Sequence, residues 1–406
     1  MRQTHAKLSL FLLICSTGVI YQLPYIKNIF YLPLMEAFSL SHLEMGVLSS
    51  AYSLFSLFSY CLGLRLPGGY ARNTLLSMAF LSTGVLGLCM ACARTFSALL
   101  VLFALLGIST ILPYFMASLN MEQFLRRELL PAAPLQSASC IRAVVSLFLG
   151  VLCVGAFLLQ SPFGTALPSV FFIYAVSCLF FGALLRAFLP RGCPAESERT
   201  AGFSSNFSFL IKKPAFWHWS LMIGCAFSSY ILTGILPAIL VFQYDFSTGE
   251  SLLLGLLRYG LAAVSGYAAV FLHQRKTSPV FLLRLGFLGT FAGFALLALP
   301  FPFTQTGVLV TVVFSVLCLS IYGQREFYYL LHDSDFFSPV PLTFVIGGIS
   351  IFCYIPEIVF NPLLGFLLDR GDYTLIFVAG MLFSALGLLL LLLRAGRSRE
   401  ASRSDR

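Results

Sequence analysis

The sequence predicts an all-α membrane protein with twelve transmembrane helices. Hydrophobic residues make up 59% of the 406 positions and charged residues only 10%, whereas a soluble domain carries about 25% charged residues. The apolar residues are grouped into runs of about 20, the length that a helix needs to cross a bilayer core of about 30 Å. These runs lack the period-two alternation of barrel strands, so we expect helices.

Each apolar run ends at Pro, Gly, Asn, Asp or basic residues, which are typical of turns. The first run continues past Tyr21 without a small-residue cleavage site, so we interpret it as a helix rather than a removed leader. In chain order, the runs span residues 8–33, 43–64, 73–92, 97–120, 135–160, 166–189, 216–242, 250–272, 279–300, 306–332, 341–368 and 373–393.

The formal charge of +9 is explained by where the Lys and Arg residues lie relative to the predicted helices. If both termini are cytoplasmic, the loops on the outer side hold only Arg94 and Arg370, and the inner segments hold the other loop Lys and Arg residues. This asymmetry is the positive-inside bias of membrane proteins. We therefore expect a multi-pass protein of the bacterial inner membrane, with the lipid bilayer rather than nucleic acid as its partner.

The longest polar stretch divides the twelve runs into two sets of six. We expect one six-helix bundle at residues 1–189 and another at 216–394, an architecture used by many carriers. A cytoplasmic linker at residues 190–215, not expected to pack, joins them, and residues 395–406 form a basic cytoplasmic tail.

Two segments resemble the major facilitator superfamily of secondary transporters. "YLPLMEAFSLSHLEMGVLSSAYSLF" (31–55) is similar to its first outer loop and second helix, and "NPLLGFLLDRGDYTLIFVAGM" (361–381) to its junction of the last two helices. The likeness is strongest to a bacterial branch distantly related to organophosphate and organic-anion carriers. The superfamily's acidic loop signature is altered, because "GLRLPGGYARN" has Pro67 or Gly68 at the acidic position.

Six charged residues lie deep in the predicted helices: Lys27, Arg142, Arg258, Arg325, Glu326 and Glu357. Each would cost about 2.5–3.5 kcal/mol at a helix centre facing lipid, so they must face protein or water. The resemblance implies that the first, fourth, seventh and tenth helices line a cavity and that the second, fifth, eighth and eleventh flank it. All six charges fall in these two groups. The surplus of two cations predicts an anionic guest.

The expected substrate is therefore a small phosphorylated, carboxylated or sulfonated organic anion, which arginine binds through two parallel N–H groups. Arg325 and Lys27 are the first choices for recognising its charge, followed by Arg258 and Arg142. Glu326 and Glu357 are candidates for a proton carrier or an ion-pair switch. Polar residues on the same helices complete the predicted site: Asn28, Tyr31, Tyr114, Tyr230, Tyr322 and Tyr329.

Four of the six deep charges also have a structural interpretation. Arg258 and Glu357 could form an ion pair between neighbouring helices, Arg142 could bind a helix end or a lipid headgroup, and Lys27 could extend to the membrane surface. The polar side chains could connect helices.

The functional hypothesis is transport of the anion by alternating access, as a monomer, with a co-transported proton or a counter-transported anion. The alternative is a transporter-like sensor that binds an anion without net flux. We expect no enzyme activity, cofactor or metal, because the five histidines lie in loops or near helix ends and no phosphate-binding loop is present.

Overall fold

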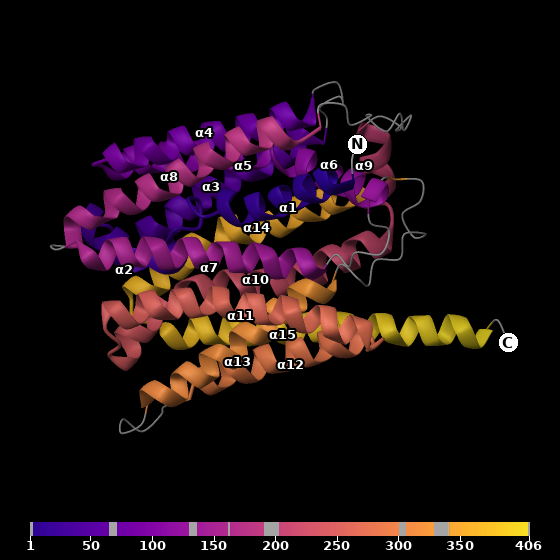
Figure 1. Cartoon of the computed structure of the whole chain (residues 1–406). Helices are drawn as coiled ribbons and strands as arrows, with labels where there is room; N and C mark the ends of the chain where they lie inside the picture. Colours follow the sequence, from indigo (N-terminus) through magenta and orange to yellow (C-terminus); the bar gives the residue numbers. More distant parts are fainter. Residues whose placement is uncertain are drawn as a thin grey trace.

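A computed structural model describes residues 3–64, 71–129, 136–160, 163–190, 203–299, 306–328, 340 and 342–404. All secondary structure in these ranges is helical (Figure 1). The helices are α1 (Gln3–Ile20), α2 (Lys27–Phe38), α3 (His42–Gly63), α4 (Arg72–Cys92), α5 (Phe96–Ile111), α6 (Phe115–Leu129), α7 (Gln136–Leu159), α8 (Phe163–Phe188), α9 (Phe203–Ile211), α10 (Pro214–Tyr244), α11 (Thr248–Gln274), α12 (Pro279–Leu297), α13 (Thr306–Phe327), α14 (Leu342–Asp369) and α15 (Tyr373–Ser404).

Within the described ranges, ten helices are long and apolar enough to cross a membrane, and α1 and α5 contribute shorter apolar helices. The all-helical membrane class is thus confirmed, but two of the twelve predicted runs are interrupted. The run at 8–33 breaks between α1 and α2 around Pro24, and the run at 97–120 breaks between α5 and α6 around Pro113. Proline has no N–H group to donate, so a helix commonly ends or kinks there.

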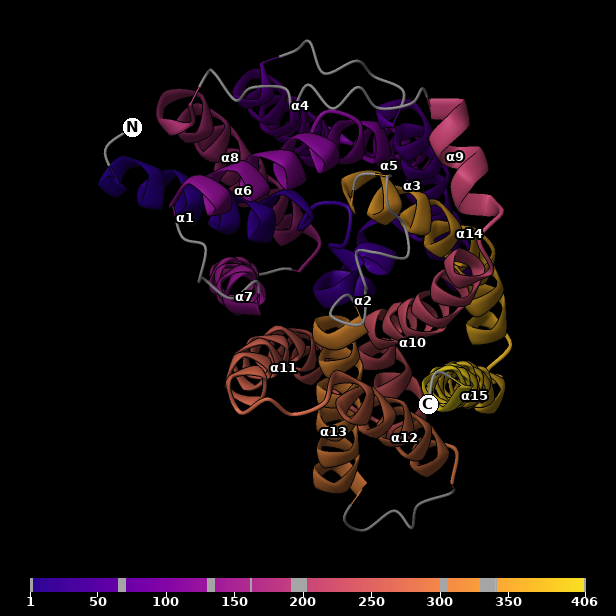
Figure 2. The ribbon, with the colours of Figure 1, turned by 90° about the vertical axis from the view of Figure 1, so that its right-hand side faces the viewer.

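The arrangement of the helices places α2 and α10 in the middle of the molecule. Seen along the helices, α1, α4, α5, α6 and α8 lie on one side and α11, α12, α13 and α15 on the other (Figure 2). The start of α1 and the end of α15 lie at the same end of the structure (Figure 1). Elements from both halves of the sequence therefore meet at the centre.

The polar segment at 190–215, which we did not expect to pack, contains α9. Leu210 and Asn206 of this helix are buried, and Leu210 packs with Phe216 and Trp219 of α10. The indole N–H of Trp217 donates to the carbonyl of Ile211 at 2.7 Å. The expectation failed because a short amphipathic helix next to many polar residues is hidden in the average composition.

Helices α3 and α14 pack closely against each other along their length. Gly46 faces the backbone of Asn361, and Gly365 faces that of His42, so a side chain at either glycine would clash. The Ser50 hydroxyl donates to the carbonyl of Ile358. Pro362, four residues after Ile358, has no N–H to bind that carbonyl within the helix, so the interface satisfies it.

Asp369, at the end of α14, closes one end of this interface. Its carboxylate accepts the backbone N–H groups of His42 and Leu43, both at 2.9 Å. These two N–H groups are at the start of α3, where a helix has unpaired donors and a partial positive charge. A carboxylate from α14 thus caps α3 and joins segments that are 327 residues apart.

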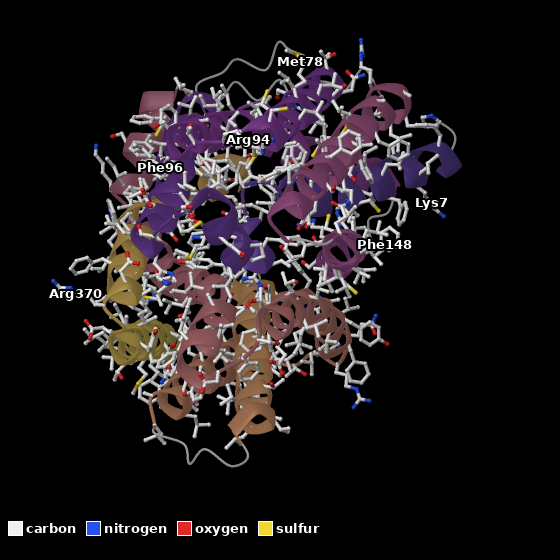
Figure 3. The ribbon with its side chains drawn as sticks, turned by 90° about the vertical axis from the view of Figure 1, so that its left-hand side faces the viewer. Lys7, Met78, Arg94, Phe96, Phe148 and Arg370 are labelled. Atoms are coloured by element: carbon white, nitrogen blue, oxygen red, sulfur yellow. The ribbon has the colours of Figure 1, made fainter. Side chains whose placement is uncertain are left out.

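Large apolar side chains cover the outside of the structure. Phe148 of α7 is 63% exposed and lies on a different side of the molecule from Arg370, which follows α14 (Figure 3). Lipid is the solvent in which such a surface is stable. The exposed apolar faces therefore agree with membrane-spanning helices.

Candidate functional site

A narrow pocket, lined mainly by residues with polar groups, lies where the central helices meet. Its charged lining residues are Lys27 at the start of α2, Arg258 of α11 and Glu357 of α14. The remaining lining residues are Tyr25, Asn28, Tyr230 and Ile231. We call this set of seven residues the central pocket.

The break in the first apolar run places three residues in the central pocket. α1 ends at Ile20 and α2 begins at Lys27, so Tyr25 precedes the second helix and Lys27 and Asn28 form its first turn. α2 is itself distorted at Phe30, three residues before Pro33. Residues 24, 27, 28 and 31 have the spacing of one face of a regular helix, but the break and the distortion mean that they do not share that geometry.

Arg258 is 1% exposed and forms no ion pair with any described residue. Its Nη1 lies 3.4 Å from the Thr233 hydroxyl, a long hydrogen bond. Its Nε and Nη2 are buried and have no hydrogen-bond partner in the described structure. These two nitrogens form one edge of the guanidinium, the edge that binds a carboxylate, sulfonate or phosphate through two parallel N–H groups.

Glu357 lines the same pocket and is 3% exposed. Its Oε2 is buried without a hydrogen-bond partner among the described atoms. Lys27, 6% exposed, donates instead to Oδ1 of Asn361 at 2.8 Å, and Asn361 donates to the backbone carbonyl of Glu357 at 2.8 Å. The pocket thus holds a cationic donor edge and an acidic acceptor that are not paired with each other.

Aromatic rings contact the guanidinium groups in and near the central pocket. The Arg325 guanidinium lies 4.1 Å from the ring centre of Tyr230, and Tyr322 packs edge-on against Tyr230 at 5.9 Å. The Arg258 guanidinium lies 5.4 Å from the ring centre of Tyr259. Such contacts stabilise a cation through the negative face of the ring.

Arg142 lies elsewhere, in a paired cluster. Its Nη2 is 3.0 Å from Oε2 of Glu122, and Arg126 contacts the other oxygen of Glu122 at 2.9 Å. We call Glu122, Arg126 and Arg142 the Glu122 cluster. Glu122 was omitted from the sequence-based charge balance because we placed it in a loop, whereas it lies in α6. Neither a helix end nor a lipid is needed to explain Arg142.

Other predicted site residues contact different parts of the structure. The Tyr31 hydroxyl is 3.1 Å from Nδ1 of His42, and the Tyr114 hydroxyl is 2.7 Å from that of Thr17. Glu326 is half-buried on α13 and does not line the central pocket. Tyr329 lies outside the described residues.

The sequence-based site omitted three residues that the structure places in or next to the central pocket. Tyr25 lines it, Thr233 contacts Arg258, and Asn361 binds Lys27. Thr233 and Asn361 belong to polar stripes at helical spacing, so the signal was present in the sequence. Tyr25 had no such signal, because it precedes the second helix instead of sharing a helical face.

Comparison with solved structures identifies the fold. A mutant form of the nucleoside transporter NupG superposes with a TM-score of 0.69 over 96% of this chain and 98% of that chain, at 12% identity. The chain has the major facilitator fold. A bacterial homolog of the human lysosomal transporter Spinster, in an inward-facing and unoccupied conformation, gives a TM-score of 0.61 over 96% of this chain and 97% of that chain, at 15% identity.

Two curated relatives from Escherichia coli K12 cover parts of this chain. The inner membrane protein YqcE is 22% identical over 60% of this chain and 58% of its own length. The inner membrane protein YihN is 30% identical over 26% of this chain and 25% of its own length. The matched regions thus span about half or less of each relative. No family model matches the chain.

Proposed function

We propose that this chain is a secondary transporter of the bacterial inner membrane that moves a small organic anion by alternating access. Its major facilitator fold and its likeness to solved transporters support the carrier class. The names of the two curated relatives support the inner membrane. The proposed architecture has two bundles, residues 1–189 and 216–394, with cytoplasmic termini, a cytoplasmic linker at 190–215 and a basic tail at 395–406.

The main support for an anionic substrate is the edge of the Arg258 guanidinium that has no hydrogen-bond partner. A buried donor without a partner costs about 1–3 kcal/mol, more when it is charged. Arg258 has two such donors side by side in a pocket lining. An anionic group that accepts both N–H groups would remove this cost, and water alone would leave the charge unbalanced.

The other cations near the pocket add to the attraction. Lys27 and Arg258 line the pocket with one acid, Glu357, and the Arg325 guanidinium lies 4.1 Å from the ring centre of Tyr230, another lining residue. Positive charge in a concave site with low-dielectric walls raises the local concentration of anions. Arg142 does not belong to this site in our proposal, since Glu122 already balances it.

Alternating access explains why this site is closed off. Arg258, Lys27 and Glu357 are all nearly inaccessible in this conformation, so a substrate can enter or leave only if helices separate. The α3–α14 interface and its Asp369 cap are the contacts that would open toward one side of the membrane. In the proposed cycle, an occupied Arg258 favours closure because its buried charge is then balanced.

A neutral ring compound is the second candidate substrate. The solved neighbour NupG is named a nucleoside transporter, and Tyr25 and Tyr230 supply ring faces in the pocket. A nucleoside would stack on these rings, but it has no anionic group for the free edge of Arg258. We therefore favour an organic anion over a nucleoside as the substrate.

Ligand-dependent thermal unfolding of the purified protein tests the anionic class. The probes are propionate, methanesulfonate, glycerol 3-phosphate and neutral uridine. We expect at least one anion, but not uridine, to raise the unfolding midpoint. Arg258→Gln should weaken its binding on the order of 100-fold, because the cost of truncating one partner of a buried charge pair is about 2–5 kcal/mol. Arg275→Gln, at the exposed end of α11, is the matched control and should bind normally.

Flux measurements with the anion that binds then separate the carrier from the sensor. The proposed carrier moves the anion into proteoliposomes, and a sensor binds it without net movement. Stabilisation by uridine alone, or normal anion binding by Arg258→Gln, would contradict the anionic site.

A further inference from the structure

We propose that the central pocket selects hydroxylated monoanions, in which an acidic group and a hydroxyl donor are present in one small molecule, over dicarboxylates and over anions without a donor. This inference rests on the proposed anion transport and adds a substrate class to it. Its basis is a second unpaired group in the same pocket.

The central pocket contains two unsatisfied groups of opposite character. Nε and Nη2 of Arg258 are buried donors without a partner, and Oε2 of Glu357 is a buried acceptor without one. Both residues line the same cavity, and no ion pair joins them. Since buried polar groups are normally hydrogen-bonded, each unsatisfied group needs an explanation, and one ligand can supply it for both.

Lys27 does not remove the need for a ligand donor at Glu357. Its ammonium is bound to Oδ1 of Asn361, and the amide of Asn361 is bound to the backbone of Glu357 rather than to its carboxylate. This chain of contacts holds Lys27 and Glu357 in place while Oε2 remains available. The Asn28 side chain, also in the lining, offers a further amide to a polar ligand.

These groups discriminate between classes of anion. A simple monocarboxylate satisfies Arg258 but leaves Oε2 of Glu357 without a donor. A dicarboxylate brings a second negative charge toward Glu357, and like charges at close range repel. A hydroxylated monoanion donates its O–H to Glu357 while its acidic group accepts from Arg258. Sites that hydrogen-bond a substrate hydroxyl strongly reject the analogue that lacks it.

The charge of the pocket lining favours a monoanion. Two cations and one acid in the lining leave a single positive charge to balance. A short hydroxy acid carries one negative charge and therefore balances it.

Thermal unfolding with four matched probes tests the selectivity. Glycerate and propionate share a three-carbon carboxylate and differ in two hydroxyls, malonate replaces them with a second carboxylate, and glycerol lacks the acid. We expect glycerate to bind at least about tenfold more tightly than propionate or malonate, since a hydrogen bond to a buried charged group is lost with the hydroxyl. Glycerol should not bind measurably.

Glu357→Gln identifies the acceptor. The amide removes the negative charge, so we expect the preference for glycerate over malonate to fall by about tenfold or more, mainly through tighter malonate binding. An unchanged ratio in this variant would overturn the role of Glu357. If the variant does not fold, the wild-type ratio of glycerate to propionate still decides the question, because it needs no substitution.

The outcomes separate this inference from the proposed function. Equal binding of glycerate and propionate, or tighter binding of malonate, would overturn the hydroxylated class and leave anion transport intact. Failure of all four probes to bind, together with the anions tested above, would overturn both.

Discussion

The Glu122 cluster and the central pocket contain the same residue types in opposite states of pairing. In the Glu122 cluster, two arginines bind the two oxygens of one carboxylate at 2.9 and 3.0 Å. In the central pocket, Arg258 and Glu357 are close enough to line one cavity but remain unpaired. The paired charges of the Glu122 cluster stabilise the fold, although Nε of Arg142 is also buried without a hydrogen-bond partner among the described atoms. The unpaired charges of the central pocket have binding capacity left for a ligand.

The largest expected effect is a loss of stability when the Glu122 cluster is broken. Glu122→Ala leaves Arg126 and Arg142 without their shared carboxylate, and we expect it to lower the free energy of unfolding by about 2–3 kcal/mol. The measurement is thermal unfolding in detergent without ligand. Glu36→Ala, at an exposed carboxylate of α2, is the control and should change stability little. Equal effects of the two variants would show that the cluster is not a stabilising unit.

The second expected effect is an increase in the free energy of unfolding. Arg258→Met replaces a buried, unpaired cation with an apolar side chain of similar reach, and we expect the ligand-free protein to gain about 1 kcal/mol. The contacts of Arg258 with Thr233 and Tyr259 offset part of this gain. The same detergent unfolding assay measures it. A clear loss of stability would mean that Arg258 is a structural residue and would remove the contrast with the Glu122 cluster.

The third expected effect, similar in size to the second, concerns Lys27, whose ammonium has a neutral hydrogen-bond partner instead of a carboxylate. Asn361→Ala removes its hydrogen-bond acceptor and should cost about 1 kcal/mol of stability, the usual value for a neutral hydrogen bond. Because the freed ammonium can then bind the substrate or Glu357, the affinity for the anion should change as well. Isothermal titration with the anion found above measures this change, and unaltered affinity and stability would show that the Lys27–Asn361 contact is dispensable.

Hydropathy predicted the position of each long helix but not where the helices would break. The runs at 8–33 and 97–120 are apolar on average, and an average over about 20 residues hides single prolines. Pro24 and Pro113 were visible in the sequence, yet proline also occurs inside α10 and α14 without ending them. Whether a proline breaks or only kinks a helix depends on which neighbours bind the carbonyl that it frees, as Ser50 does for Ile358.

The candidate site was predictable only as a set of unusual residues. The cost of a charge in lipid selected Lys27, Arg142, Arg258, Arg325, Glu326 and Glu357 without any structure. It could not separate Arg142, which Glu122 neutralises, from Arg258, which no described carboxylate reaches. Both are arginines in apolar runs, and their sequence environments do not differ in a way that shows their partners.

The sequence by itself therefore determined the solvent of this protein, its helical class and the list of charges that need an explanation, because these follow from local composition and from the free energy of moving residues into lipid. The tertiary structure alone decided which charges are satisfied. Pairing depends on ångström-scale distances between helices that lie far apart in the chain, such as the contact from Lys27 to Asn361, and hydropathy carries no information about those distances.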